Sequence, residues 1–259
     1  MCTLILGVDV TGPNTVIVGA NRDEDPARPR EPPGVLLADP RVVGGRDRRA
    51  GGTWLAVREA RALVAMLNRR DPGPPPPARR SRGLLALETA GVTTAGADLT
   101  GAALARAALD HALADLRAHA YAPFSMVFAT PGACWMIAHE PGRPAPVADI
   151  PAGWHVLTHT DLDDPSEPRA ARLLREIAAW RPRSADEAAR GLAERLREHG
   201  EGGEPVCIHD GRMATVSSSR VWLAPGEARY VHIEGRPCVG AESDVTPLLS
   251  TDPRVQEPS

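Results

Sequence analysis

The second residue of the chain is a cysteine that stands directly before a run of strand-forming residues, in MCTLILGVDV. Removal of Met1 would place a thiol and a free α-amino group on the same α-carbon. Thiolate is the nucleophilic form of cysteine, and a free thiol has a pKa of roughly 8.5, whereas an α-amino group titrates at roughly 7.7–8.0. Cys2 would then carry a nucleophile beside a base of suitable strength. The alternative is a small buried residue at the start of an edge strand.

Four polar residues follow the next apolar run, in VIVGANRDED. Because side chains alternate across a strand, Asn21 and Asp23 would share one face, and Arg22 and Glu24 the other. If this strand pairs with the first, the carboxylate of Asp23 could approach the new α-amino group and hold it in its charged form. The alternative is a solvated strand end that carries a surface ion pair.

The elements that must position these residues follow from hydrophobic periodicity and turn signals. The residues TGPN predict a hairpin between strands at 3–9 and 15–23. A leucine stripe predicts a helix after Thr100, and a Ser184–Glu187 capping box predicts the start of another. A further helix is expected from the stripe Leu173, Ile177 and Trp180, and further strands at 53–59, 62–67, 124–130, 134–140, 154–159 and, as a pair around a Pro-Gly turn, 213–235.

This order of strands, helices, strands, helices and strands favours an α+β fold with antiparallel sheets. We expect a single domain over 1–250 and a loose polar tail at 251–259. The net charge of −3 gives no reason to expect nucleic acid. No apolar run approaches the roughly 18 residues that span a bilayer, and no signal-peptide pattern is present. The sequence therefore predicts a cytoplasmic protein with reduced thiols.

Local spacing argues against a metal or a cofactor. The chain has four cysteines and eight histidines, but no CxxC pair and no HExxH. Cys134 and Cys207 lie in apolar contexts and are expected to be core residues. No glycine pattern of the GxGxxG or GK[ST] type is present either. We predict no metal site and no bound cofactor.

Several motifs occur together in this chain: MC at the start, ANRDE at 20–24, GGTWLAV at 51–57, SRG at 81–83 and YAPFSMVFA at 121–129. In this order they resemble the NRDE family, also called the transport and Golgi organisation protein 2 family. That family is similar to the N-terminal-nucleophile cysteine hydrolases. The resemblance implies an α+β fold of that type, a four-layer αββα sandwich in which two antiparallel sheets lie between helices.

The resemblance also implies roles for particular residues. Cys2 matches the nucleophile, Asp23 the residue that binds the terminal amine, and Asn68 an oxyanion donor. His159 stands where the relatives usually have a second oxyanion-binding asparagine, and Val216 where they commonly have arginine. The residues expected to bind substrate are Asn21, Arg22, Trp54 (otherwise a packing anchor) and the nearby Arg220.

Two functions stay open at this point. The first is an amidohydrolase or acyltransferase that acts on a small amide or thioester through an acyl-Cys2 intermediate. The second is a non-catalytic haem or lipid carrier or chaperone with a degenerate hydrolase site, which the departures at His159 and Val216 motivate. The expected partner is a small-molecule acyl substrate. Whether the chain forms a homo-oligomer is left open.

Overall fold

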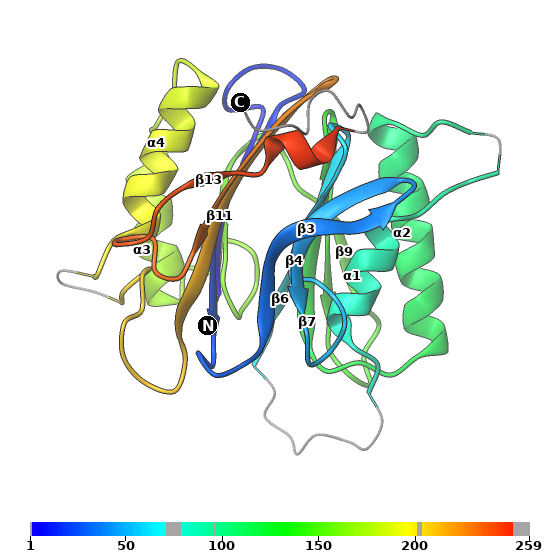
Figure 1. Cartoon of the computed structure of the whole chain (residues 1–259), viewed down its shortest axis with the longest axis horizontal. Coiled ribbons are helices and arrows are strands. Elements are labelled where there is room, and N and C mark those ends of the chain that lie inside the picture. The colour runs from blue at the N-terminus through cyan, green and yellow to red at the C-terminus, as the bar shows by residue number, and fades with distance from the viewer. Residues whose placement is uncertain (1, 71–78, 96, 201–203, 251–259) are drawn as a thin grey trace. The chain divides into compact units, whose positions relative to one another are not determined.

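The computed structural model describes residues 2–70, 79–95, 97–200 and 204–250, so the predicted tail at 251–259 lies outside the described residues. The chain divides into two compact units. The first comprises Met1–Arg28, Pro151–Leu223 and Arg229–Val245, and the second comprises Pro29–Ile150, Ala224–Ala228 and Thr246–Ser259. Each contains one antiparallel sheet with helices packed against it (Figure 1). The single domain over 1–250 stays a prediction.

The sheet of the first unit is built around the predicted hairpin. Its strand order is β10-β1-β2-β11-β12-β13. The hairpin is tight because Asp9 and Asn14 adopt positive φ angles of 57° and 54°, and the backbone N–H of Asp9 donates to the carbonyl of Thr15. The strands are β1 (Thr3–Val8), β2 (Val16–Glu24), β10 (Gly153–Leu157), β11 (Ala214–Ala224), β12 (Glu227–Glu234) and β13 (Ser243–Asp244).

Two helices cover one face of this sheet, α3 (Pro168–Ile177) and α4 (Ala185–Leu196). The Ser184 half of the predicted capping box is confirmed, because its hydroxyl accepts from the backbone N–H of Glu187 at 3.1 Å. The Glu187 carboxylate accepts from the backbone N–H of Arg183 at 3.1 Å. The core between helices and sheet contains Ile5, Ile17, Trp154, Val156, Leu173, Ile177, Leu192 and Leu196. Ile17 therefore faces the two helices, and so do the other residues of β2 that lie two, four or six positions after it.

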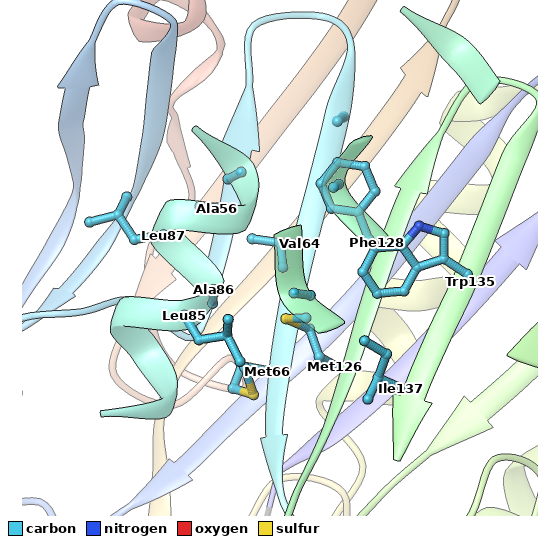
Figure 2. Packing of buried hydrophobic residues seen from close by; sticks show 14 of the residues in the cluster. Ala56, Val64, Met66, Leu85, Ala86, Leu87, Met126, Phe128, Trp135 and Ile137 are labelled. Carbon is cyan, nitrogen blue, oxygen red and sulfur yellow. The ribbon is translucent and has the colours of Figure 1, made fainter. Parts of the chain in front are cut away.

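The second unit is a seven-stranded sheet whose strands follow their order in the chain. Figure 2 shows its core, where Leu85 and Ala86 lie over Val64 and Met66 beside Met126 and Phe128. The elements are β3 (Arg30–Ala38), β4 (Arg41–Asp47), β5 (Leu55–Arg58), β6 (Ala62–Asn68), β7 (Phe124–Thr130), β8 (Ala133–His139), β9 (Val147–Asp149), α1 (Arg82–Ala90), α2 (Gly101–Ala118) and the 3₁₀ helix η1 (Thr246–Leu249). The prediction had omitted β3, β4, β9, α1 and η1.

Two of the sequence motifs, GGTW and SRG, meet at a close backbone contact in the second unit. The backbone N–H of Thr53 donates to the carbonyl of Gly83 at 3.0 Å. A Cβ on Gly52 would come within 2.0 Å of the Gly83 carbonyl carbon, so no other residue fits there without movement of the backbone. These glycines therefore have a packing role.

Across the described residues, no helix is long and apolar enough to cross a membrane.

Candidate active site

Cys2 lies at the start of β1 with its sulfur against the end of β2. The strands pair in the register Thr3↔Asn21, so Cys2 reaches the two residues that follow Asn21. Its Sγ accepts from the backbone N–H of Asp23 at 3.4 Å and lies 3.7 Å from the carbonyl oxygen of the same residue. The half-buried sulfur therefore contacts the backbone of Asp23, the acid that the sequence analysis predicted to lie near Cys2.

The carboxylate of Asp23 is fully buried and held by residues from two other elements. Its Oδ1 accepts from the hydroxyl of Thr215 on β11 at 2.6 Å. That hydroxyl accepts in turn from the backbone N–H of Ile208 at 2.8 Å, which fixes its orientation. A guanidinium nitrogen of Arg169 lies 3.8 Å from Oδ2 and donates to Thr3 at 2.9 Å. Asp23 is therefore a rigidly positioned acid beside the nucleophile candidate.

Burial dominates the acid–base properties of both groups. Burial raises the pKa of Asp23, and the Thr215 hydrogen bond and the positive charge of Arg169 oppose that rise. Burial, and next the charge of Asp23, raises the pKa of the Cys2 thiol to about 11. At neutral pH the sulfur is consequently a thiol in this arrangement, and a positive charge close to it is needed to make the thiolate.

Asn21 shares the face of Asp23, as the alternation predicted, and it points toward the helices. Its amide nitrogen donates to the carbonyls of Leu196 at 2.9 Å and Val206 at 3.0 Å. Both amide protons are therefore used to fasten the end of α4 and the segment before β11. Arg22, on the opposite face, is buried and pairs with Glu24 at 3.7 Å. Substrate binding by these two residues stays a prediction.

A β-bulge lies in β11 where the sequence departs from the family pattern. Thr215 pairs with Asp23 and Ser217 pairs with Arg22, so Val216 is the extra residue. Beyond the bulge, Arg220 pairs with Gly19, four residues from Asp23 on the same face of β2. At about 3.3 Å per residue that separation is roughly 13 Å. Arg220 is too distant along the sheet to replace an arginine at position 216.

Arg220 lines a cavity of about 480 Å³ between α4, β11 and β12. Its guanidinium lies 2.8 Å from the carboxylate of Glu242, which also binds Arg197 at 3.2 Å. Trp222 and Arg229 complete the same wall, with the Arg229 guanidinium 5.7 Å from the indole centroid. Substrate binding by Arg220 stays a prediction.

His159 follows β10, the neighbour of β1 on the side away from β2. The register pairs Leu4 with Leu157. The pairing ends there, and His159 lies in a bend two residues beyond the end of β10. The residue is buried, with 4% of its surface exposed. Its role as an oxyanion donor stays a prediction.

Asn68 and Trp54 belong to the second unit. Asn68 ends β6 and pairs with Phe124. The Trp54 indole packs over Gly45, where a Cβ would come within 2.3 Å of the ring. This contact supports the packing interpretation of Trp54, and the proposed roles of both residues toward substrate stay predictions.

The spacing of residues along the chain did not predict one cluster of possible metal ligands, which lies in the first unit. His199, Cys207, His209 and Cys238 bring their ligand atoms within 4.8 Å of one another. The prediction of no zinc site used only ligands close in sequence, whereas this set combines the connection between α4 and β11 with the one that follows β12. Cys207 is buried as predicted, but it lies in a connection rather than in a strand.

Solved structures resemble the chain at low sequence identity. A Caenorhabditis elegans N-acylethanolamine-hydrolyzing acid amidase ortholog matches with a TM-score of 0.56 and 16% identity, over 87% of this chain and 94% of that one. A mutant conjugated bile acid hydrolase from Clostridium perfringens matches with a TM-score of 0.51 and 11% identity, over 95% and 92%. The likeness shows the predicted fold, α+β with two antiparallel sheets, of the N-terminal-nucleophile hydrolase type.

Sequence comparison gives the family. No curated protein sequence matches the chain significantly. The family model described as "Transport and Golgi organisation 2" matches residues 1–205, which is more than half of the 259 residues. The motifs ANRDE, GGTW and SRG, which carried the resemblance, all lie within that range. The chain therefore belongs to the Transport and Golgi organisation 2 family.

Proposed function

We propose that this protein is an N-terminal cysteine amidohydrolase or acyltransferase that acts on a small amide or thioester. The observation that carries the proposal is the contact of the Cys2 sulfur with the backbone of Asp23, whose buried carboxylate is held by Thr215. The proposal requires that the residue before Cys2 be removed. The two solved structures are named for hydrolysing N-acylethanolamines and conjugated bile acids, which supports an acyl compound as substrate.

The proposed chemistry uses the amine that removal exposes. The α-amino group of Cys2 takes the thiol proton, and the resulting ammonium beside Asp23 offsets the burial and the negative charge that raise the thiol pKa. The thiolate attacks the carbonyl carbon, and Asn68 and His159 are the proposed donors to the oxyanion. The bond to the leaving nitrogen or sulfur breaks as that atom receives the proton. Water or an acceptor amine then cleaves the acyl thioester and restores the thiol.

The decisive experiment is intact-mass analysis of the purified protein before and after exposure to an acyl thioester and to a β-lactone probe. We expect a chain that begins at Cys2 and one acyl adduct on that residue. A Cys2→Ala variant should give none, and Cys134→Ala, in β8 of the second unit, is the matched control that should react like the original protein. An adduct that persists in Cys2→Ala would contradict the proposal, as would a processed chain that forms none with either probe.

The carrier alternative is favoured by one observation, the buried imidazole of His159 at a position where relatives have an amide. It predicts an absorbance shift on haem titration that His159→Asn abolishes, together with no acyl adduct. Flat spectra together with an adduct on Cys2 would support acyl transfer and contradict the carrier function. The two functions are thus separated by two measurements on the same preparations.

A further inference from the structure

The four residues His199, Cys207, His209 and Cys238 form a compact donor set in the first unit. The two sulfurs lie 3.7 Å apart. The Nε2 of His209 lies 3.1 Å from the sulfur of Cys238, and the rings of His199 and His209 meet edge to face at 4.5 Å between centroids. Both cysteines are free thiols. Two soft sulfur donors and two imidazoles in one place are an unusual grouping for a surface without a function.

These distances fit a tetrahedral metal centre. Zinc binds cysteine sulfur at about 2.3 Å, and a tetrahedral angle then separates two such sulfurs by about 3.8 Å. The observed separation of 3.7 Å is close to that value. A disulfide would need the sulfurs at about 2.05 Å. A tetrahedral set of two sulfurs and two nitrogens is typical of zinc among the divalent ions.

We propose that His199, Cys207, His209 and Cys238 bind one Zn²⁺ ion in a structural Cys₂His₂ site. On binding, each thiol loses its proton to solvent, and the two thiolates balance the charge of the ion. Each imidazole binds in its neutral form through one nitrogen. Because all four positions are taken by protein ligands, no position is left for water or substrate, as in structural zinc sites.

The surroundings of His209 allow this arrangement. The guanidinium of Arg236 lies 3.1 Å from its Nδ1. When Nε2 binds the metal, Nδ1 carries the proton, so the guanidinium must turn away; Arg236 is exposed and free to do so.

The metal site would join two connections of the first unit. His199, Cys207 and His209 lie between α4 and β11, and Cys238 follows β12. The backbone N–H groups of Val206 and Cys207 both donate to the carbonyl of Glu198, which already draws the start and the end of the first connection together. A zinc ion would bind the second connection to it.

The segment around the ligand Cys207 also makes hydrogen bonds to the residues around Asp23. Val206 accepts from Asn21, and Ile208, next to the ligand Cys207, donates to Thr215. Thr215 in turn donates to the Asp23 carboxylate. The zinc ion would therefore act at a distance, as a positioning element for Asp23, without contact to a substrate. Its existence does not rest on the proposed acyl-transfer activity.

The first test measures metal in the protein itself. Protein purified without chelator should contain about one zinc ion per chain by plasma mass spectrometry. After chelator treatment, Co²⁺ should give the visible bands and the thiolate charge-transfer band of a tetrahedral thiolate site. The double variant Cys207→Ser with Cys238→Ser should lose both signals, and Cys134→Ser, which alters a free cysteine of the second unit, should keep them. Cys2→Ala should also keep them, whether or not the protein is an acyl-transfer enzyme.

A second variant tests the same zinc site in case the double variant does not fold. His199 is exposed, so His199→Gln should leave the fold intact by circular dichroism and still lose the bound zinc. His119→Gln, an exposed histidine that follows α2, is its control. Three results would each overturn the proposal: zinc-free protein whose apo form gives no thiolate–cobalt band, a cobalt band unchanged in the double variant, or a Cys207–Cys238 disulfide in the native protein.

Discussion

Two regions of the first unit carry cysteine in different electrostatic settings. At Cys2 the sulfur contacts the backbone of Asp23, and burial and then the charge of that residue raise the pKa of the thiol. At Cys207 and Cys238 the two sulfurs lie beside each other, and the sulfur of Cys238 lies beside the imidazole of His209. The α-amino group of the processed chain would supply positive charge to the first region, and a bound metal ion would supply it to the second.

Burial alone does not decide what a thiol does. Burial raises the pKa of Cys2 to about 11 and that of Cys134 to about 12. The charge of Asp149 also raises the pKa of Cys134, which is a buried residue of β8. Cys2 has a firmly held acid beside it, so a single covalent event, the exposure of its amine, is expected to change its protonation.

The largest effect is expected from Cys2→Ala. Loss of the nucleophile should lower acyl transfer by roughly three orders of magnitude or more, because the covalent step cannot occur. Steady-state turnover of a thioester or amide donor measures it. The matched variant Cys238→Ala, which removes a sulfur of the other region, should retain acyl transfer to within roughly tenfold. Equal losses in the two variants would erase the distinction between the regions.

A pH series on unprocessed protein tests the setting of Cys2. In chain that retains Met1, the thiolate fraction of a group with a pKa of about 11 should rise by about a thousandfold between pH 7 and pH 10. Iodoacetamide labelling of Cys2, followed by peptide mass spectrometry, should rise in proportion. Processed protein should instead label readily near neutral pH. A labelling plateau near pH 7 in the unprocessed chain would contradict the account of burial given above.

Asp23→Asn should have effects of opposite sign on the two forms. In processed protein, the loss of the acid that holds the ammonium should slow acyl transfer by about a hundredfold. In unprocessed protein, the same change removes a charge that raises the Cys2 pKa, so labelling should become faster. Both rates are measured on one variant, with Asp210→Asn, an exposed aspartate, as the control. Slower labelling of the unprocessed variant would count against the electrostatic argument.

The same variant bears on stability. Because burial raises the pKa of Asp23, the native state holds that proton more tightly than the unfolded chain does. The stability that Asp23 contributes is therefore complete below its unfolded pKa of about 3.9 and is lost as the pH rises toward the native value. Urea unfolding at pH 7 should accordingly find Asp23→Asn more stable than the original protein, as expected where a residue is kept for function.

The hairpin and the contact between Cys2 and Asp23 were predictable, and the neighbouring contacts were not. The TGPN turn and the alternation after Val18 are local signals, so they brought Cys2 and Asp23 together correctly. The partners of Asn21 lie 175 and 185 residues away, on connections that only the packed helices position. The Cys207 and Cys238 sulfurs meet across 31 residues for the same reason. No rule based on hydrophobic periodicity or on local spacing predicts contacts between residues so far apart in the sequence.

Thr215→Val gives the smallest and most informative effect, since Thr215 connects the two regions. Valine keeps the shape but removes a hydroxyl that donates to Asp23 and accepts from Ile208. A hydrogen bond to a charged group contributes about 1.5–3 kcal/mol, and the lower end of that range corresponds to roughly a tenfold loss of acyl transfer, which is expected with little change in zinc content. Thr94→Val, an exposed threonine of the second unit, is the control for urea unfolding and turnover. If Thr215→Val released zinc while leaving turnover unchanged, Thr215 would belong to the metal-binding region and not to the site at Cys2.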